Sequence, residues 1–528
     1  MESHEKVGAA LDMAEPKKRV KDFDDLLPLV GEFGWYQRLL FLMMIPYAFF
    51  FAFVYFGQIF MTLVPEQHWC YVEELQNMTV EQRRHLSIPR LDEKYHKCQV
   101  YDVDWMKVIQ DGVTEPDTKW PTKKCEKQWE YNFTDVPYQT IATQLNWVCD
   151  EDNKGATAQS IFFCGAIVGG LLFGWIADKY GRVPALVVIE YVGLKWRTFV
   201  SNMSIAVYFT FAACMLPWIA LGVADWRVYT LVISVPLVLA VFTPCLVPES
   251  ARWLISQGRI EESIKILQKC GKVNGKKLPD DIIKEFRETA AELAKSEQEV
   301  KNYSALDLFK TPRLRKHSIL LVLIWCCTAM VFDGHVRNVG SLGLDMFLTF
   351  TVATATEFPA DVLLISVLDI LGRRWLAFGS MVISGIFSFL ATTVAQGIPS
   401  ASLAIVGRFA VNISYNIGMQ YAAELLPTVV RAQGLALIHI TGYVATILVP
   451  YIVYMATIAV EIPLLILGAL GILGGTLCLF LPESMGKAMP QTIQDGENYG
   501  LGQRFWEFPC CGRKNLPNKE DVETVEKY

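Results

Sequence analysis

The sequence predicts an all-α membrane protein built from two related helical bundles. Of its 528 residues, 52% are hydrophobic and 19% are charged, and the mean hydropathy is +0.29. The apolar residues gather in runs of roughly twenty, which is long enough for a helix to cross about 30 Å of hydrocarbon. Charged loop motifs recur in the same order in the two halves of the chain, which indicates a duplicated bundle.

Ten apolar segments are expected to span the membrane, because each is long and poor in charge. They cover residues 38–64, 156–177, 199–223, 228–247, 317–338, 342–367, 375–396, 401–423, 434–458 and 462–481. A basic cluster that includes Lys17, Lys18 and Arg19 precedes the first segment, and basic flanks of this kind stay in the cytoplasm. An even number of spans then places both termini in the cytoplasm.

The long loop after the first span, residues 65–154, is expected to be extracellular. It contains four cysteines and two glycosylation sequons: Cys70, Cys98, Cys125 and Cys149, with Asn77 and Asn132. In an oxidising compartment the four cysteines are expected to form two disulfides, and three pairings are open. Both asparagines are expected to carry glycans.

The chain is expected to divide into five parts. These are a cytoplasmic tail (1–37), an N-terminal bundle (38–247) that includes the long loop, a charged cytoplasmic linker (248–316), a six-helix bundle (317–482) and a cytoplasmic tail (483–528). Two amphipathic stretches in the linker, near 257–270 and 280–299, predict helices.

Three pairs of loop motifs carry the internal repeat. GWIADKYGR, ending at Arg182, matches SVLDILGR, ending at Arg373. EYVGLKWR (190–197) matches ELLPTVVR (424–431), and PESARW (248–253) matches PESMGK (482–487). Two copies of one bundle create a midplane cavity where they meet.

The spacing of these motifs indicates that the first bundle is shorter than the second. Arg373 lies 51 residues before Glu424, whereas Arg182 lies only 8 residues before Glu190, a shortfall of 43. That length corresponds to two spans and a tight turn, so we expect four spans in the first bundle and six in the second. Two interpretations are open: a splice variant or annotation artefact of a twelve-span parent, or a protein that has ten spans.

The chain resembles the organic cation, carnitine and organic anion transporter branch of the major facilitator superfamily. The resemblance extends over nearly all of residues 22–485 and rests on the cysteine-bearing loop and on ADKYGR, EYVGLKWRTFVSNMS, PESARWL, NVGSLGLD, TEFPA and AAELLPTVVRAQG. The C-terminal half, with GLALIHITGYVATILVPYIVY and DGENYGLGQRFWEFPCC, is similar to insect organic cation and carcinine transporters. The resemblance implies a two-bundle major facilitator fold, here with about ten spans (four and six) in place of twelve.

The resemblance also implies a substrate site. Glu357 matches the acidic residue of the family's eighth span, which faces the cavity and attracts cations; the alternative is a carboxyl satisfied by a neighbouring helix. Asp333 is either a substrate ligand or a hydrated end-of-span residue, with His335 and Arg337 near enough in sequence to neutralise it. Tyr443 occupies the position where cation carriers place Asp and anion or carnitine carriers place Arg. His439 is either a ligand or hydrogen-bonded packing.

Aromatic residues in these spans, including Phe332 and Tyr415, are expected either to wall the cavity with cation-π faces or simply to pack. The charged loop motifs are expected to form a cytoplasmic gate through ion pairs that break when the halves rock. Its members are Asp178, Arg182, Glu190, Arg197, Glu249 and Arg252 in the first half, and Asp369, Arg373, Glu424, Arg431 and Glu483 in the second.

The predicted function is transport of small organic cations or zwitterions, such as carcinine-like amines, across the plasma membrane by alternating access. The expected partners are an amine substrate and the lipid bilayer, with no nucleic acid, cofactor or metal. The sequence has no phosphate-binding loop or nucleophile constellation, so an enzyme is not expected. The alternative is a transport-impaired, truncated isoform that is retained or that modulates the full-length carrier.

Overall fold

The computed structural model describes residues 26–43, 45–91, 94–126, 128–180, 191, 204–238, 248–300, 304–487, 489–503 and 506. These residues fall into two compact units. Unit 1 takes its residues from Met1–Met43, Tyr180–Ser201 and Thr243–Lys301, and unit 2 takes the rest. The predicted domain boundaries stay predictions.

Outside the long loop, the helices that the first half of the chain contributes to unit 2 are α3 (Ile45–Met61), α7 (Asn153–Tyr180), α10 (Thr210–Val223) and α11 (Trp226–Val238), with a π-helical turn at Ser204–Phe209 before α10. Phe56 and Phe60 of α3 are fully buried in a core that also contains Leu216 of α10. Gly57 lets α3 approach α11, because a Cβ at this position would lie 2.5 Å from Ile233 Cδ1.

The second half supplies the larger set of helices in unit 2. They are α16 (Pro312–Arg337), α17 (Met346–Ala355), α18 (Glu357–Leu371), α19 (Arg373–Thr393), α20 (Ile398–Leu425), α21 (Arg431–Thr446), α22 (Val449–Tyr454), α23 (Ile462–Cys478) and α24 (Ile493–Asn498). Gly385 of α19 lies against the backbone of Gly468 and Gly471 in α23. Such small-residue contacts are how helices pack closely in membranes.

A helix overlaps each of the ten predicted spans, although residues 199–203 and 239–247 lie outside the described part. Within the described part of the chain, six helical stretches are long and apolar enough to cross a membrane: Trp35–Met61, Cys149–Leu172, Pro312–Leu342, Met346–Leu371, Arg373–Thr393 and Arg431–Thr457. Residues 181–190 and 192–203, next to the proposed 43-residue gap, also lie outside the described residues.

Two of the predicted spans are interrupted by proline. The segment 342–367 divides into α17 and α18, and the segment 434–458 divides into α21 and α22. Proline has no N–H to bond the carbonyl four residues earlier. Pro359 follows Ala355, the last residue of α17, by four positions, and Pro450 follows Thr446, the last residue of α21, by four. The breaks therefore have a local cause.

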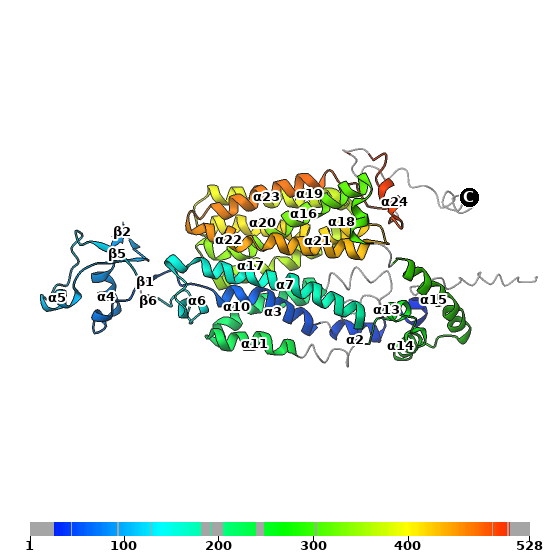
Figure 1. The fold of residues 1–528 in the computed structure, drawn as a ribbon, viewed down its shortest axis with the longest axis horizontal. Helices are drawn as coiled ribbons and strands as arrows, with labels where there is room; N and C mark the ends of the chain where they lie inside the picture. The colour runs from blue at the N-terminus through cyan, green and yellow to red at the C-terminus, as the bar shows by residue number, and fades with distance from the viewer. Residues whose placement is uncertain are drawn as a thin grey trace, which may run out of the picture. The chain divides into compact units, whose positions relative to one another are not determined.

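The long loop folds into a small domain at one end of the unit 2 helices, and α24 lies at the opposite end (Figure 1). The strands of the loop domain pair antiparallel: β1 (His68–Cys70) with β6 (Trp129–Tyr131), β2 (Arg90–Leu91) with β3 (Lys94–Tyr95), and β4 (Gln99–Tyr101) with β5 (Thr122–Lys124). Its helices are α4 (Val80–Ser87), α5 (Trp105–Gln110) and α6 (Ile141–Gln144). The predicted disulfides form, and the pairing is Cys70–Cys125 and Cys98–Cys149.

Unit 1 contains α1 (Leu27–Val30), α2 (Trp35–Met43), α13 (Ala251–Ser256), α14 (Ile260–Val273) and α15 (Asp280–Val300). The last two correspond to the amphipathic stretches predicted in the linker. Asn274 ties α14 to the N-terminal segment: its Nδ2 donates to Val30 O at 2.8 Å, and its Oδ1 accepts from Tyr36 N at 2.9 Å.

Candidate substrate site in the helical bundle

An aromatic pocket forms in unit 2 where α3, α16, α20 and α21 meet. The Phe332 and Tyr415 rings stack with centroids 4.5 Å apart, and Trp325 lies 4.9 Å from Tyr415 and 5.5 Å from His439. A cavity of about 10 Å³ lies among Tyr55, Trp325, Tyr415, His439 and Tyr443. The structure thus brings together four predicted site residues, namely Phe332, Tyr415, His439 and Tyr443. The space holds about one water molecule, so this conformation is closed around the pocket.

Asp333, beside this pocket, is neutralised within its own helix. Arg337 Nε donates to Asp333 Oδ2 at 2.7 Å, four residues along α16, and both side chains are at most 2% exposed. Tyr55 Oη donates to Asp333 Oδ1 at 3.3 Å. His335, the other candidate partner, instead contacts Ser388 Oγ through Nε2 at 3.0 Å. A charge removed from water needs such compensation.

Glu357, the first residue of α18, is satisfied by a neighbouring helix. Arg408 Nη2 of α20 donates to Glu357 Oε1 at 2.6 Å, and both side chains are at most 4% exposed. The same nitrogen lies 3.1 Å from Thr354 Oγ1. In this conformation Glu357 does not line the aromatic pocket. Its role as a substrate carboxylate stays a prediction.

Two residues near Glu357 escaped the sequence analysis. Asp361, one turn along α18, accepts from Asn416 Nδ2 at 2.5 Å and from Asn412 Nδ2 at 3.3 Å. Arg408 precedes these asparagines on α20 at intervals of four residues. Side chains four residues apart lie on the same face of a helix. The four-residue spacing of polar residues in both α18 and α20 was therefore a sequence signal for a polar contact between these helices. An ionisable group in a span is a functional candidate by default.

Four of the five residues predicted for the second half of the gate form one hydrogen-bonded cluster at the end of unit 2 away from the loop domain. Arg373 pairs with Asp369 at 3.0 Å and with Glu424 at 3.2 Å. Glu483 accepts from the backbone N–H of Arg373 at 2.9 Å, and Ser484 Oγ donates to Glu424 at 2.6 Å. Arg431 does not join these acids, because its Nε donates to Leu426 O at 3.2 Å.

The first-half gate residues are only partly described. Arg182, Glu190 and Arg197 lie outside the described residues, as do the side chains of Asp178 and Arg252. The PES motif, in contrast, is described in both halves, and its backbone contact is the same in each. Ser250 N donates to Glu249 Oε1 at 3.0 Å in unit 1, and Ser484 N donates to Glu483 Oε1 at 3.0 Å in unit 2. The two PES segments thus share a backbone contact as well as a sequence.

No group of three or more His, Cys, Asp or Glu side chains that could hold a metal ion occurs among the described residues. The apolar helices, the repeated loop motifs and the closed interior pocket together define a multi-pass membrane carrier of the major facilitator type.

Comparisons with known proteins identify the branch. The family model "Sugar (and other) transporter" matches residues 196–492, more than half of the chain. The "Carcinine transporter" of Drosophila melanogaster is 31% identical over 93% of this chain and 81% of its own length. "Solute carrier family 22 member 1" of Bos taurus is 30% identical over 90% of this chain and 92% of its own length. The chain belongs to the organic cation, carnitine and organic anion transporter branch of the major facilitator superfamily.

Among solved structures, the chain is similar to the inward-open xylose transporter XylE from E. coli. It matches with a TM-score of 0.46 and 17% identity over 67% of this chain and 91% of that chain.

Proposed function

We propose that this carrier moves small amines, as organic cations or zwitterions, by alternating access to the aromatic pocket of unit 2. The observation that carries the proposal is the ring cluster of Trp325, Phe332 and Tyr415, closed on one side by Tyr55 and its contact with Asp333. Ring faces attract ammonium groups, most strongly when both are desolvated. The similarity to a carcinine transporter supports an amine substrate.

Three buried carboxyl groups on α16 and α18 support a cation or zwitterion over an anion. Asp333 and Glu357 each pair with an arginine, and Asp361 contacts amide groups without a cationic partner among the described residues. Asp361 is therefore the one of these three carboxyl groups that an incoming cationic group is free to pair with.

The proposed orientation places the disulfide-bonded loop domain outside the cell and both termini in the cytoplasm of a plasma-membrane carrier. Disulfides persist in oxidising compartments, which supports an extracellular loop. The Arg373–Glu424 cluster then lies on the cytoplasmic side and serves as half of an inner gate, since ion pairs that form and break allow the halves to rock.

Uptake of radiolabelled carcinine by cells with confirmed surface expression tests the transport proposal. We expect saturable uptake that unlabelled amines inhibit and that Tyr415→Ala reduces. Protein at the surface without uptake contradicts the proposal for this chain.

A second function, that of a transport-impaired isoform, is favoured by the 43-residue shortfall between the Arg182 and Glu190 motifs. Without two spans, small or polar helix faces in the first bundle meet lipid in place of protein. Insertion of a two-span segment from a twelve-span relative between Val188 and Ile189 separates the alternatives. Restored surface expression and uptake indicate an impaired isoform, whereas equal uptake before and after insertion indicates a competent carrier.

A further inference from the structure

Asp361 is a buried carboxyl group of α18 that no described arginine neutralises. It is 3% exposed, and its Oδ1 accepts both of its hydrogen bonds, from Asn416 Nδ2 at 2.5 Å and from Asn412 Nδ2 at 3.3 Å. Its Oδ2 has no hydrogen-bond partner among the described residues. An ionised carboxylate removed from water needs a cation, because amide donors offset only part of the cost. Oδ2 is therefore the place where a proton or an incoming cation is required.

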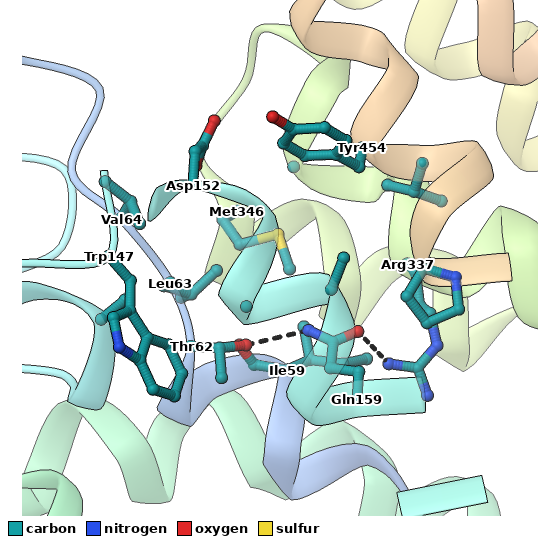
Figure 2. Close-up of a pocket in the computed structure, with 16 residues that line it drawn as sticks. Ile59, Thr62, Leu63, Val64, Trp147, Asp152, Gln159, Arg337, Met346 and Tyr454 are labelled. Carbon is teal, nitrogen blue, oxygen red and sulfur yellow. Dashed lines mark hydrogen bonds between the residues drawn. The ribbon is translucent and has the colours of Figure 1, made fainter. Parts of the chain in front are cut away.

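The Arg337–Asp333 pair of α16 cannot supply that cation. Arg337 Nε donates to Asp333 Oδ2 at 2.7 Å, and its Nη1 donates to Gln159 Oε1 at 2.5 Å. Figure 2 shows that Gln159 is fixed in turn, because its Nε2 donates to Thr62 Oγ1 at 2.9 Å. This guanidinium is held by its own helix and by α7, and Asp333 already offsets its charge.

The Glu357–Arg408 pair lies one turn from Asp361 and is neutral as well. Arg408 Nη2 donates to Glu357 Oε1 at 2.6 Å. Arg408 Nε and Nη1 are buried without a partner, and no described hydrogen bond or ion pair joins this arginine to Asp361. The three side chains together carry one net negative charge when Asp361 is ionised and none when it is protonated.

Other titratable groups near this part of α18 make no bond to Asp361. Among the described elements packed against α18, α17 has no titratable side chain. The others contribute Tyr208 from the π-helical turn, Arg373 and Arg374 from α19, and Arg408, Tyr415, Tyr421 and Glu424 from α20. No described hydrogen bond or ion pair joins any of these side chains to Asp361, so the two asparagines are its bonded partners.

We propose that Asp361 is a proton-binding site and that its proton exchanges for the substrate cation. The proton leaves Oδ2 for water when the helices separate and the cation approaches, and a proton returns to Oδ2 when the cation departs. The cluster of Glu357, Arg408 and Asp361 thereby stays compensated in both states. This inference rests on the proposed function, because it names the ion that moves against the amine.

Infrared difference spectroscopy of the purified full-length chain in nanodiscs tests the proton site. A protonated carboxyl group has a carbonyl stretch that a carboxylate lacks, and we expect a band of this kind that grows on acidification and is missing in Asp361→Asn. Asp345→Asn is the matched control, since Asp345 is exposed and caps α17 through Leu348 N at 2.7 Å, and asparagine also caps helices well. A band that survives Asp361→Asn, or that does not change with pH, overturns the proposal.

Tetraethylammonium, whose charge does not depend on pH, tests the exchange. We expect its binding to the native chain in nanodiscs to release about one proton per bound cation into a weak buffer, and to weaken by up to about tenfold for each unit by which the pH is lowered. At saturating concentration Asp361→Asn is expected to bind it without proton release. Binding to the native chain that releases no proton overturns the exchange.

The two experiments separate this inference from the transport proposal. A pH-dependent band that Asp361→Asn removes, found without amine uptake or tetraethylammonium binding, contradicts transport and exchange and leaves the proton site standing. Amine uptake without such a band contradicts the proton site and leaves the transport proposal standing.

Discussion

At the scale of single residues, the interior of unit 2 is organised by buried charge pairs. The Arg337–Asp333 pair lies within one helix, whereas the Arg408–Glu357 pair joins α20 to α18. Desolvation makes a buried pair a weak source of net stability, but loss of one partner leaves the other charge uncompensated. These pairs therefore add little net stability, but each charged side chain requires its particular partner.

Glu357→Gln is expected to destabilise the protein by about 3–5 kcal/mol, because it leaves the Arg408 guanidinium buried without an ionic partner. The measurement is the thermal midpoint of the detergent-solubilised protein by fluorescence-detected size exclusion. The double variant Glu357→Gln with Arg408→Gln is expected to recover much of the loss. An unchanged midpoint in the single variant contradicts the importance of this pair.

Tyr415→Ala is expected to reduce amine uptake roughly tenfold, because it removes the ring between Phe332 and Trp325 that would face an ammonium group. Tyr415→Phe is the matched control, since it keeps the ring and removes only the hydroxyl. Initial uptake rates normalised to surface protein measure both. Equal rates for the Ala and Phe variants show that the ring face does not bind substrate.

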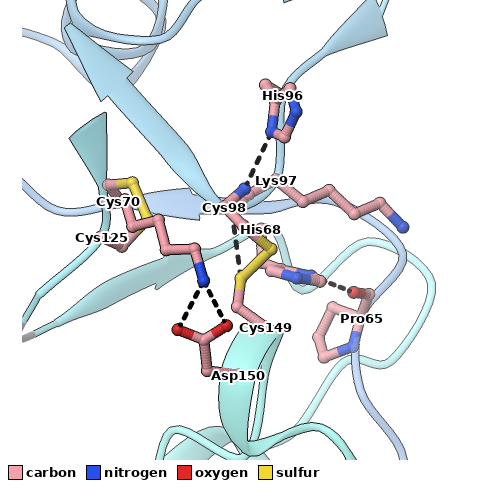
Figure 3. The surroundings of a disulfide bond; sticks show 10 residues. Pro65, His68, Cys70, His96, Lys97, Cys98, Cys125, Cys149 and Asp150 are labelled. Atoms are coloured by element: carbon pink, nitrogen blue, oxygen red, sulfur yellow. Dashed lines mark hydrogen bonds and ion pairs between the residues drawn. A yellow bond between two sulfur atoms is a disulfide. The ribbon is translucent and has the colours of Figure 1, made fainter. Parts of the chain in front are cut away.

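At the scale of elements, the loop domain is a small fold held by covalent links. Its strands are two or three residues long, and short strands alone give little stability. The Cys70–Cys125 disulfide joins the end of β1 to the end of β5, and Cys98–Cys149 joins the start of β4 to the turn before α7 (Figure 3). Each encloses more than fifty residues, which in the chain-entropy account corresponds to about 4 kcal/mol.

Peptide mapping without reduction is expected to find two linked pairs, Cys70 with Cys125 and Cys98 with Cys149. Cys98→Ser with Cys149→Ser is expected to destabilise the loop domain by about 4 kcal/mol, seen as faster limited proteolysis of intact cells. A Cys70–Cys98 or Cys70–Cys149 linkage in the native protein contradicts the described pairing.

We expect the loop domain to lose stability in acid, because His68 is buried in its neutral form. Burial lowers the pKa of His68 below its ordinary value of 6.5, and its ring Nδ1 lies 3.1 Å from Pro65 O (Figure 3). The unfolded chain binds the proton more readily, so the stabilising contribution is complete above the unfolded pKa and is lost as pH falls through the folded pKa.

Limited proteolysis of the loop domain between about pH 7.5 and about pH 5.5 checks this sign. Cleavage is expected to accelerate on acidification in the native chain and to vary less with pH in His68→Asn. A native loop domain that becomes more resistant in acid contradicts it.

At the scale of the whole molecule, function depends on exchange between conformations. The aromatic pocket is closed to about 10 Å³, too small for any amine substrate, so transport requires helices to separate. The Arg373 cluster joins the α18–α19 turn to α20 and to the segment after α23. The proposed gate acts through the free energy that these ion pairs add to one conformation and not to the other.

Arg373→Gln is expected to lower the maximal uptake rate several-fold with little change in half-saturating substrate concentration, because Glu424 and Asp369 lose their shared cation far from the pocket. Arg315→Gln, at an exposed position on α16, is the matched control for loss of a positive charge. A change confined to half-saturation places Arg373 in substrate binding and contradicts the gate.

The sequence predicted the membrane class, the helix positions and the family, because hydropathy and loop motifs are local properties of the chain. Pro359 and Pro450 also mark the breaks in two spans, and this signal is present in the sequence. The loop motifs that recur in the same order in both halves predicted duplication, and the two PES segments share a local geometry.

Only the tertiary structure decided which partners meet. The sequence offered His335 and Arg337 equally to Asp333, left three disulfide pairings open, and did not single out Arg408 or Asp361. Helix rotation and packing choose among these, since Glu357 and Arg408 are 51 residues apart and become neighbours only when α18 and α20 pack. Local pattern specifies what a segment becomes, whereas the contacts of a buried charge depend on the three-dimensional arrangement of all its neighbours.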